Sequence, residues 1–171
     1  MKLSTPRLFA NFTAVALLLG LAGQASAADA AQRSAGVERG RYLVTIGGCN
    51  DCHTAGYLEQ GGTTPESQWL TGSPVGYQGP WGTTYAANLR LVAGRMTEVE
   101  WVAHARKERL PPMPWFNVKA MSDSDLKAVY AFIRSLGQPG RPAPAYVAPG
   151  GKVTTPYFVF VPQVDQKQVA R

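Results

Sequence analysis

The chain is poor in residues that hold metal ions, with two cysteines and two histidines among its 171 residues. A structural zinc site needs four ligands, usually supplied as two closely spaced pairs. Cys49, Cys52, His53 and His104 are all that the sequence offers, and no second pair accompanies Cys49 and Cys52. This shortage argues against a zinc site.

Long apolar runs and strong charge of one sign are also missing. No segment after residue 27 is apolar enough to cross a bilayer, which takes about 20 residues. Removal of residues 1–27 takes away Lys2 and Arg7 but no acid, leaving 15 Lys and Arg against 11 Asp and Glu, a net charge of +4. Such a mild surplus does not indicate nucleic-acid binding. It suits transient docking to an acidic protein surface, or serves solubility alone.

The first 27 residues have the features of a secretory signal. Lys2 and Arg7 form the charged start, and residues 9–23 are mostly apolar. The small residues of 25–27, Ala-Ser-Ala, predict cleavage before Ala28. A retained membrane anchor is the alternative, but the apolar run is short and no stop-transfer charges follow it. We therefore expect export to the periplasm and a mature domain over residues 28–137.

The most informative motif is C-x-x-C-H, formed by Cys49, Cys52 and His53. It is the attachment motif of c-type haem. The two thiols are spaced to add to the two vinyl groups of a porphyrin, which brings the His53 imidazole against one face of the ring as an axial ligand of the iron. The sequence thus predicts one covalent haem c and one of its metal ligands together.

Two other kinds of site use the same cysteine spacing. In an oxidising compartment a C-x-x-C pair can close as a disulfide. A thioredoxin-like redox motif uses the same spacing but requires a βαβ context. Glycines and polar residues surround Cys49 instead, and His53 follows directly. Both observations favour haem.

The segment before the motif predicts a first helix. Residues 28–33 are Ala-rich and expected to fray, and Ser34 can cap a helix that runs to Ile46. Gly40 lowers its helix propensity by about 1 kcal/mol relative to alanine, which is tolerable where another helix crosses closely. Gly47 and Gly48 then end the helix.

Two further helices follow a long segment, residues 53–94, that is rich in glycine, proline and aromatics and is predicted to be loop rather than sheet. Thr97 and Glu100 have the spacing of a capping box and start a helix predicted to reach about residue 108. The strongest helical pattern covers residues 122–136, with apolar residues at helical spacing.

Between these two helices lies a proline-rich strap, residues 110–118, in which Met113 is flanked by Pro112 and Pro114. Prolines fix φ and exclude helix. A thioether ligand loses little entropy on binding iron when its loop is already stiff. Met113 is therefore the predicted second axial ligand, ahead of Met96, Met121 and His104 and of an open iron position.

The last segment, residues 138–171, changes composition. Its first part is rich in proline and glycine and is predicted to be extended. Residues 157–161 have the pattern of a strand, and we expect its aromatic side chains to be buried either against the domain or against a partner.

Together these features resemble the single-haem class I cytochrome c family along most of the mature length, and especially the cytochrome c modules of periplasmic dehydrogenases. The segments that carry the likeness are Arg39-Gly40-Arg41-Tyr42-Leu43, Cys49-Asn50-Asp51-Cys52-His53-Thr54, Gly82-Thr83-Thr84-Tyr85-Ala86-Ala87-Asn88-Leu89, Pro112-Met113-Pro114-Trp115 and residues 125–136.

The resemblance implies a mostly α, cytochrome c-like fold, with three or more helices and long loops around a covalent haem. It implies that the first and last helices cross beside the haem, with Gly40 and Tyr130 at the crossing. It also implies that Tyr85, Asn88 or Trp115 hydrogen-bonds the haem propionates.

Function follows from the expected ligands. Two axial ligands, His53 and Met113, leave no iron position for a substrate, so the chain is predicted to carry single electrons in the periplasm rather than to catalyse a reaction. Its expected partners are redox proteins: a dehydrogenase, other cytochromes or a terminal oxidase. A fixed subunit of a dehydrogenase complex, peripherally associated with the membrane, is the main alternative, and a haem-based gas sensor a weaker one. Dehydrogenase-linked subunits often carry several haems, whereas this chain has one motif.

Overall fold

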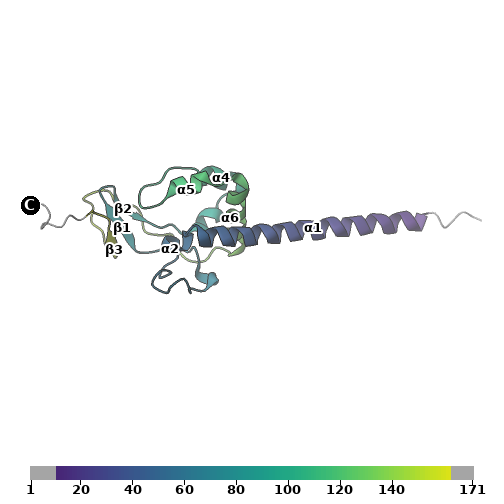
Figure 1. Cartoon of the computed structure of the whole chain (residues 1–171), viewed down its shortest axis with the longest axis horizontal. Coiled ribbons are helices and arrows are strands. Elements are labelled where there is room, and N and C mark those ends of the chain that lie inside the picture. Colours follow the sequence, from purple (N-terminus) through teal and green to yellow (C-terminus); the bar gives the residue numbers. More distant parts are fainter. Residues whose placement is uncertain (1–10, 163–171) are drawn as a thin grey trace, which may run out of the picture.

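The computed structural model describes the backbone of residues 11–162 and the side chains of residues 29–162. Helices dominate the described part of the chain, which confirms the mostly α fold class. In Figure 1, α1 runs out from one side of the domain and the small sheet lies at the opposite side. The elements are α1 (Asn11–Ile46), α2 (Cys49–His53), the 3-10 helix η1 (Glu66–Gln68), β1 (Gly76–Gly79), β2 (Gly82–Tyr85), α3 (Leu89–Gly94), α4 (Glu98–Ala105), α5 (Trp115–Ala120), α6 (Asp123–Ser135) and β3 (Tyr157–Val159).

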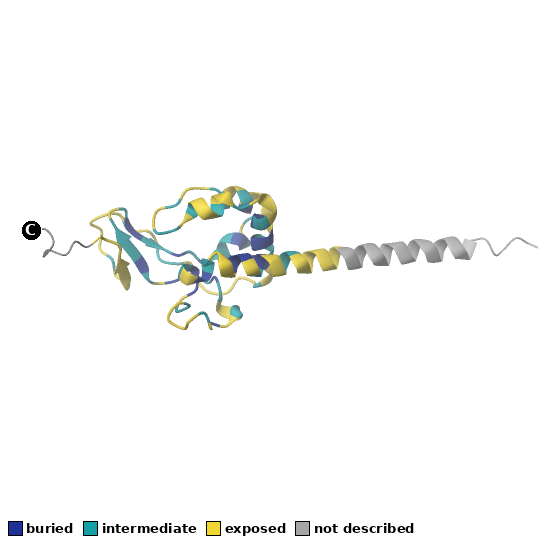
Figure 2. Cartoon of the chain, in the orientation of Figure 1, coloured by how far each residue is buried: buried dark blue, intermediate teal, exposed yellow. Residues whose placement is uncertain are grey.

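The core forms where the last turns of α1 pack against α6. Gly40 is at the crossing: a Cβ atom built there would lie 2.0 Å from the carbonyl oxygen of Ala128 and 2.7 Å from Cβ of Phe132. The expected close approach at Gly40 is therefore confirmed. Tyr130 packs against the edge of this core: its ring lies on Trp101 and its hydroxyl donates to the carbonyl of Met96 at 2.7 Å, and its place at the crossing itself stays a prediction. Figure 2 shows buried residues at this helix pair, with others in the sheet and loops. The buried hydrophobic cluster consists of Leu43, Val44, Leu70, Ala93, Trp101, Ala128, Val129, Phe132 and Ile133.

The predicted start of the first helix was wrong. Residues 28–33 are helical, and Ser34 lies inside α1 instead of capping it. Alanine has the highest helix propensity, so the Ala-rich segment continues the helix although residues 29–35 are exposed. The side chains of the predicted leader, residues 1–27, lie outside the described part of the chain, and its cleavage stays a prediction. Among the described residues, no helix has both the length and the hydropathy to span a membrane.

Capping sets the start of the other two long helices, as predicted. Thr97 accepts from the backbone N–H of Glu100, and the Glu100 carboxylate accepts from the backbone N–H of Thr97 at 2.8 Å. Ser122 accepts from the N–H of Asp125 at 3.1 Å, and Gly137 follows the last turn of α6 with a positive φ of 75°. The helix α4, which Thr97 caps, ends at Ala105 and is shorter than predicted.

The capping box gives a first testable prediction. Thr97→Ala should destabilise the fold by about 1 kcal/mol at neutral pH, because the N-cap oxygen is lost. The hydrogen bonds from Thr97 hold the pKa of Glu100 below its ordinary value of 4.5. The Glu100 carboxylate therefore contributes to the stability of the fold above pH 4.5, and this contribution is lost as the pH falls through the lowered pKa. Urea unfolding should show that the wild type has a higher free energy of unfolding than the variant at pH 7, and that this difference becomes smaller near pH 3.

The prediction that residues 53–94 form a loop was only partly correct. β1 and β2 form an antiparallel hairpin in which Tyr77 pairs with Thr84, and β3 joins β1 in parallel, giving the sheet order β2-β1-β3. Another correction concerns the strap, because the helix α5 begins at Trp115, directly after Pro114. Proline excludes helix before this point but is well tolerated just ahead of a first helical turn.

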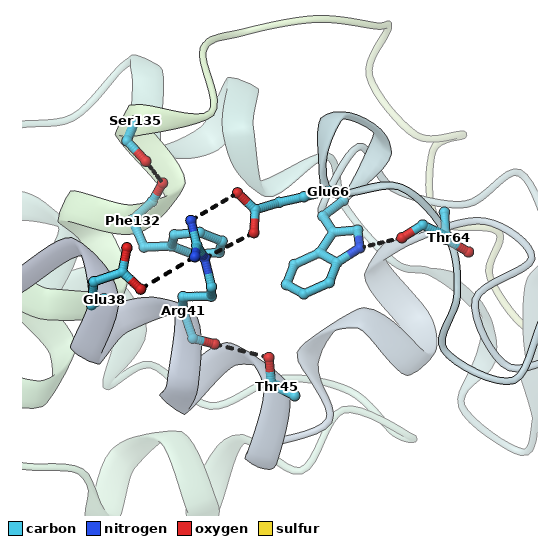
Figure 3. Close-up of polar contacts among 8 residues, drawn as sticks. Glu38, Arg41, Thr45, Thr64, Glu66, Phe132 and Ser135 are labelled. Carbon is cyan, nitrogen blue, oxygen red and sulfur yellow. Dashed lines mark hydrogen bonds and ion pairs between the residues drawn. The ribbon is translucent and has the colours of Figure 1, made fainter.

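The loop after α2 is fastened to the helix pair by Arg41 (Figure 3). Its guanidinium lies over the ring of Phe132, 5.7 Å from the centroid, and pairs with Glu66 of η1 and with Glu38 one turn away. Nη2 of Arg41 donates to Glu66 at 3.2 Å. In the same view an indole N–H, that of Trp69, donates to the carbonyl of Thr64 at 2.8 Å. The cluster joins α1, α6 and the loop into one body.

Candidate functional site: the C-x-x-C-H helix and the methionine strap

Cys49, Cys52 and His53 lie on α2, a short helix that starts directly after α1. Gly48 makes the bend possible: it adopts the left-handed conformation with φ 64°, and a Cβ there would meet the Asp51 carboxylate at 2.9 Å. One helical turn separates Cys49 from Cys52, which places both sulfurs on the same side of α2.

Both cysteines are free and half-buried, so the disulfide alternative is absent from the structure. Burial, reinforced by the charge of Asp51, raises the pKa of the Cys49 thiol to about 11. A metal binds the thiolate rather than the thiol, so this environment disfavours a metal–thiolate site. Within the described residues, no group of three His, Cys, Asp or Glu side chains is placed to hold a metal ion.

His53 is buried and has one ring nitrogen fixed by the backbone. Nδ1 lies 2.7 Å from the carbonyl oxygen of Ala87. A carbonyl only accepts, so Nδ1 carries the proton and Nε2 keeps its lone pair. Burial lowers the pKa of His53, and the bond to Ala87 offsets only part of that effect. The side chain is thus a neutral imidazole with Nε2 available as a ligand.

Hydrogen bonds from side chains and from the backbone hold the helix α2 in place. The hydroxyl of Thr54 donates to the Asn50 side chain at 2.7 Å and accepts from the N–H of Leu70 at 2.8 Å. The carbonyl of His53 accepts from the N–H of Gly72 at 2.7 Å. These bonds fix the orientation of α2 before any cofactor binds.

Met113 is half-buried in the strap between α4 and α5, and both ends of the strap are anchored. Arg106 donates to the carbonyls of Lys119 and Met121, at 2.8 and 3.3 Å, and pairs with Asp123. Past Met113, its carbonyl accepts from the N–H of Trp115 at 2.9 Å. The stiffness predicted from the prolines is therefore reinforced by hydrogen bonds.

The β1–β2 hairpin connects the motif helix with the strap. On β2, the hydroxyl of Thr84 donates to the carbonyl of Pro111 in the strap at 2.8 Å. On β1, burial and an interaction of its hydroxyl with the Cys52 side chain raise the pKa of Tyr77. The hairpin thus touches α2 on one strand and the strap on the other.

Comparison with known families matches residues 37–137 to the family described as cytochrome c. The chain belongs to the cytochrome c family. Members of this family transfer electrons by means of a covalently bound haem c, so the resident cofactor is haem c and the protein is an electron-transfer protein.

Two curated relatives are the cytochrome c subunits of alcohol dehydrogenase (quinone) from Gluconacetobacter polyoxogenes and Komagataeibacter europaeus. Each is 32% identical over 152 residues, which covers 79% of this chain and 30% of the relative. The cytochrome thus spans less than a third of the length of these relatives. No solved structure matches it.

The donor set of this cytochrome fits the cofactor. Attachment needs two thiols on one side of a helix, and an axial ligand needs a neutral imidazole with a free nitrogen. Cys49 and Cys52 meet the first condition, and Nε2 of His53 meets the second. The fixed Nδ1–H of His53 also matches a general feature of metal-bound histidines, whose second nitrogen donates to a backbone or carboxylate oxygen.

The three residues predicted to meet the propionates have different surroundings. The Tyr85 hydroxyl lies 2.7 Å from Oγ1 of Thr155. Trp115 begins α5, with Nζ of Lys119 5.4 Å from its ring centroid. Asn88 is buried, and its amide donates to the carbonyls of Pro139 and Arg141 while its oxygen caps α3. Both N–H donors of Asn88 are therefore engaged within the protein, and a propionate contact by Asn88 stays a prediction.

The alternative iron ligands are less suitable. Nε2 of His104 lies 3.0 Å from Nη2 of Arg109, which can only donate, so the lone pair of that nitrogen is taken. Burial and the charge of Arg109 lower the pKa of His104. Met121 ends α5, and its Cε lies 3.8 Å from the position a Cβ on Gly47 would occupy, at the junction of α1 and α2.

Two contributors to the site escaped the sequence analysis. Ala87 acts through its carbonyl oxygen, and no side-chain pattern marks that role. Tyr77 is one of several aromatics in a segment predicted to be loop, and only the pairing of β1 with β2 and β3 places it at Cys52.

Proposed function

We propose that this cytochrome is a periplasmic single-electron carrier whose haem iron takes His53 and Met113 as axial ligands. The observation that carries the proposal is the His53–Ala87 hydrogen bond, which leaves Nε2 as the only free ligand atom of the ring. The anchored strap around Met113 supports the second ligand, since a fixed loop keeps a weak thioether in place.

The haem, when bound, supplies reversible one-electron exchange at its iron. The residues of the chain tune that exchange. A thioether is a soft, neutral donor that favours ferrous iron, and burial disfavours the extra charge of the ferric form. Both effects raise the reduction potential relative to haem with two histidine ligands. With His53 and Met113 as ligands, little has to move when an electron arrives or leaves.

A fixed subunit of a dehydrogenase complex is the second candidate. The relatives' printed names place them in such a complex, and apolar residues near the end of the described chain are partly exposed. Residues 157–161 keep between 44% and 61% of their surface exposed. The strand returns to the domain as β3, but its side chains are only partly buried there, and their burial against a partner stays a prediction. Co-purification from native membrane and soluble fractions distinguishes the candidates, since a carrier is recovered alone.

The direct test uses the mature chain expressed with a c-type haem maturation system. We expect the mass of the chain plus one haem, and a pyridine haemochrome assay should give one haem per chain. The ferric form should show the near-infrared sulfur–iron charge-transfer band, and the ferrous form should resist carbon monoxide. A colourless chain would refute haem attachment. Rapid and tight carbon monoxide binding would instead favour a gas sensor with an open iron position.

A further inference from the structure

We infer that residues 139–161, which lie beyond the cytochrome c family match, are positioning residues of the haem site rather than an appended arm. The inference rests on the proposed ligands, and concerns how this segment, called here the tail, fixes the elements that carry or contact them. The family match ends at residue 137, so nothing in that match assigns the tail a role.

The tail flanks the β1–β2 hairpin on both edges. Along the outer edge of β2, the N–H of Thr83 donates to the carbonyl of Val147 at 2.7 Å and its carbonyl accepts from Val147 at 3.0 Å. Along β1, the tail supplies the parallel strand β3, and the N–H of Phe160 donates to the carbonyl of Gln78 at 2.7 Å. A Cβ on Gly82 would lie 2.3 Å from the Val147 oxygen, so the approach is close.

Side chains add two further links between the tail and the hairpin. The hydroxyl of Tyr146 donates to the carbonyl of Trp81 at 2.7 Å. The hydroxyls of Tyr85 and Thr155 lie 2.7 Å apart. The hairpin is therefore held at its turn and at its end by the tail. Because Thr84 of this hairpin bonds the strap, the tail indirectly supports Met113.

The tail also reaches the histidine side of the site. Asn88 donates to the carbonyls of Pro139 and Arg141, at 2.9 and 3.3 Å, and caps α3. Ala87, the residue before it, supplies the oxygen that accepts from His53. Asn88 is therefore the link through which the tail holds the acceptor of the proposed ligand.

Finally, the tail packs against Tyr77 of β1. The rings of Phe158 and Phe160 lie 5.9 and 5.8 Å from the ring of Tyr77, which interacts with Cys52. In a strand, residues two apart share a face, so Val159 points to the opposite side. This arrangement offers a matched pair of substitutions on one strand, with Val159 as the control.

The first experiment measures the midpoint potential of the haem-loaded mature protein. Phe158→Ala combined with Phe160→Ala should lower the potential relative to wild type, because the loss of these rings exposes Tyr77 to water, and water near the haem site favours the more charged ferric form. Val159→Ala should leave it unchanged. Replacing both phenylalanines with leucine should restore most of the difference if apolar cover is what matters. Equal potentials in all four proteins would contradict this role for β3.

A second pair tests the link to the strap. Tyr85→Phe and Thr155→Val each remove the same hydrogen bond, so the double variant should match either single one. A hydrogen bond contributes about 1 kcal/mol to the closed state of the strap. Its loss should therefore raise the apparent affinity of the ferrous protein for carbon monoxide by a factor on the order of three to ten. The exposed Lys152 provides the control, Lys152→Ala. Unchanged binding in the single and double variants would contradict the link.

A third variant ends the chain after Gln138. We expect it to keep its covalent haem but to lose most of the near-infrared sulfur–iron band. If this truncated chain does not fold, the point variants of the first two experiments test the role of the tail. A wild type without the band would refute the proposed ligand Met113. A wild type with the band, whose variants all keep its band, potential and resistance to carbon monoxide, would refute only the role of the tail.

Discussion

Replacing Gly40 with alanine should destabilise the haem-loaded protein by about 3 kcal/mol or more. The new Cβ would lie 2.0 Å from the carbonyl oxygen of Ala128 and 2.6 Å from its carbonyl carbon. Both are backbone atoms of α6, which cannot turn away as a flexible side chain can. The helices α1 and α6 would have to separate at the centre of the core. Urea unfolding at neutral pH measures the loss directly.

Gly36 offers the matched control, one turn earlier in α1. A Cβ there meets nothing within 4 Å. Gly36→Ala should therefore leave stability unchanged or raise it by up to about 1 kcal/mol, through helix propensity alone. If the two alanine variants unfolded at the same urea concentration, the close crossing at Gly40 would be refuted. Recovery of one haem per chain in Gly40→Ala would separate a weakened fold from failed haem attachment.

The helices could be predicted because their signals are local. Thr97 with Glu100 and Ser122 ahead of an apolar stripe mark helix starts within four residues of sequence. The sheet could not be predicted in this way. Its strands have three or four residues, and β3 reaches β1 across about 80 residues of chain. Tyr77 and Phe158 show no preference for one another until the fold brings them together.

The same distinction applies to the site. Cys49, Cys52 and His53 are contiguous, so the cofactor follows from their spacing. The acceptor of His53 is a backbone oxygen 34 residues away, which no composition or motif can mark. Asn88 has a role that its segment did not indicate: its N–H donors bind the tail, while its expected haem contact stays a prediction. The tail itself has no helical or strand pattern except at its end.

Replacing Met113 with leucine should have the largest effect on the haem. Leucine keeps most of the volume of methionine, so the strap should stay folded while the sulfur is lost. The ferric protein should then lose its near-infrared sulfur–iron band. The ferrous protein should bind carbon monoxide, and the reduction potential should fall because the soft axial donor is gone. Absorption spectra, carbon monoxide titration and a redox titration measure the three changes.

Met96→Leu is the matched control, because Met96 is also half-buried but belongs to the approach to α4 rather than to the strap. It should keep the band, the potential and the resistance to carbon monoxide. A band that survives in Met113→Leu and disappears in Met96→Leu would reassign the ligand to residue 96. If both variants kept the band, Met121, the remaining methionine near α2, would be the candidate for the thioether ligand. The strap would then be a structural connection held by Thr84 and Arg106, and its stiffness would serve the fold rather than the iron.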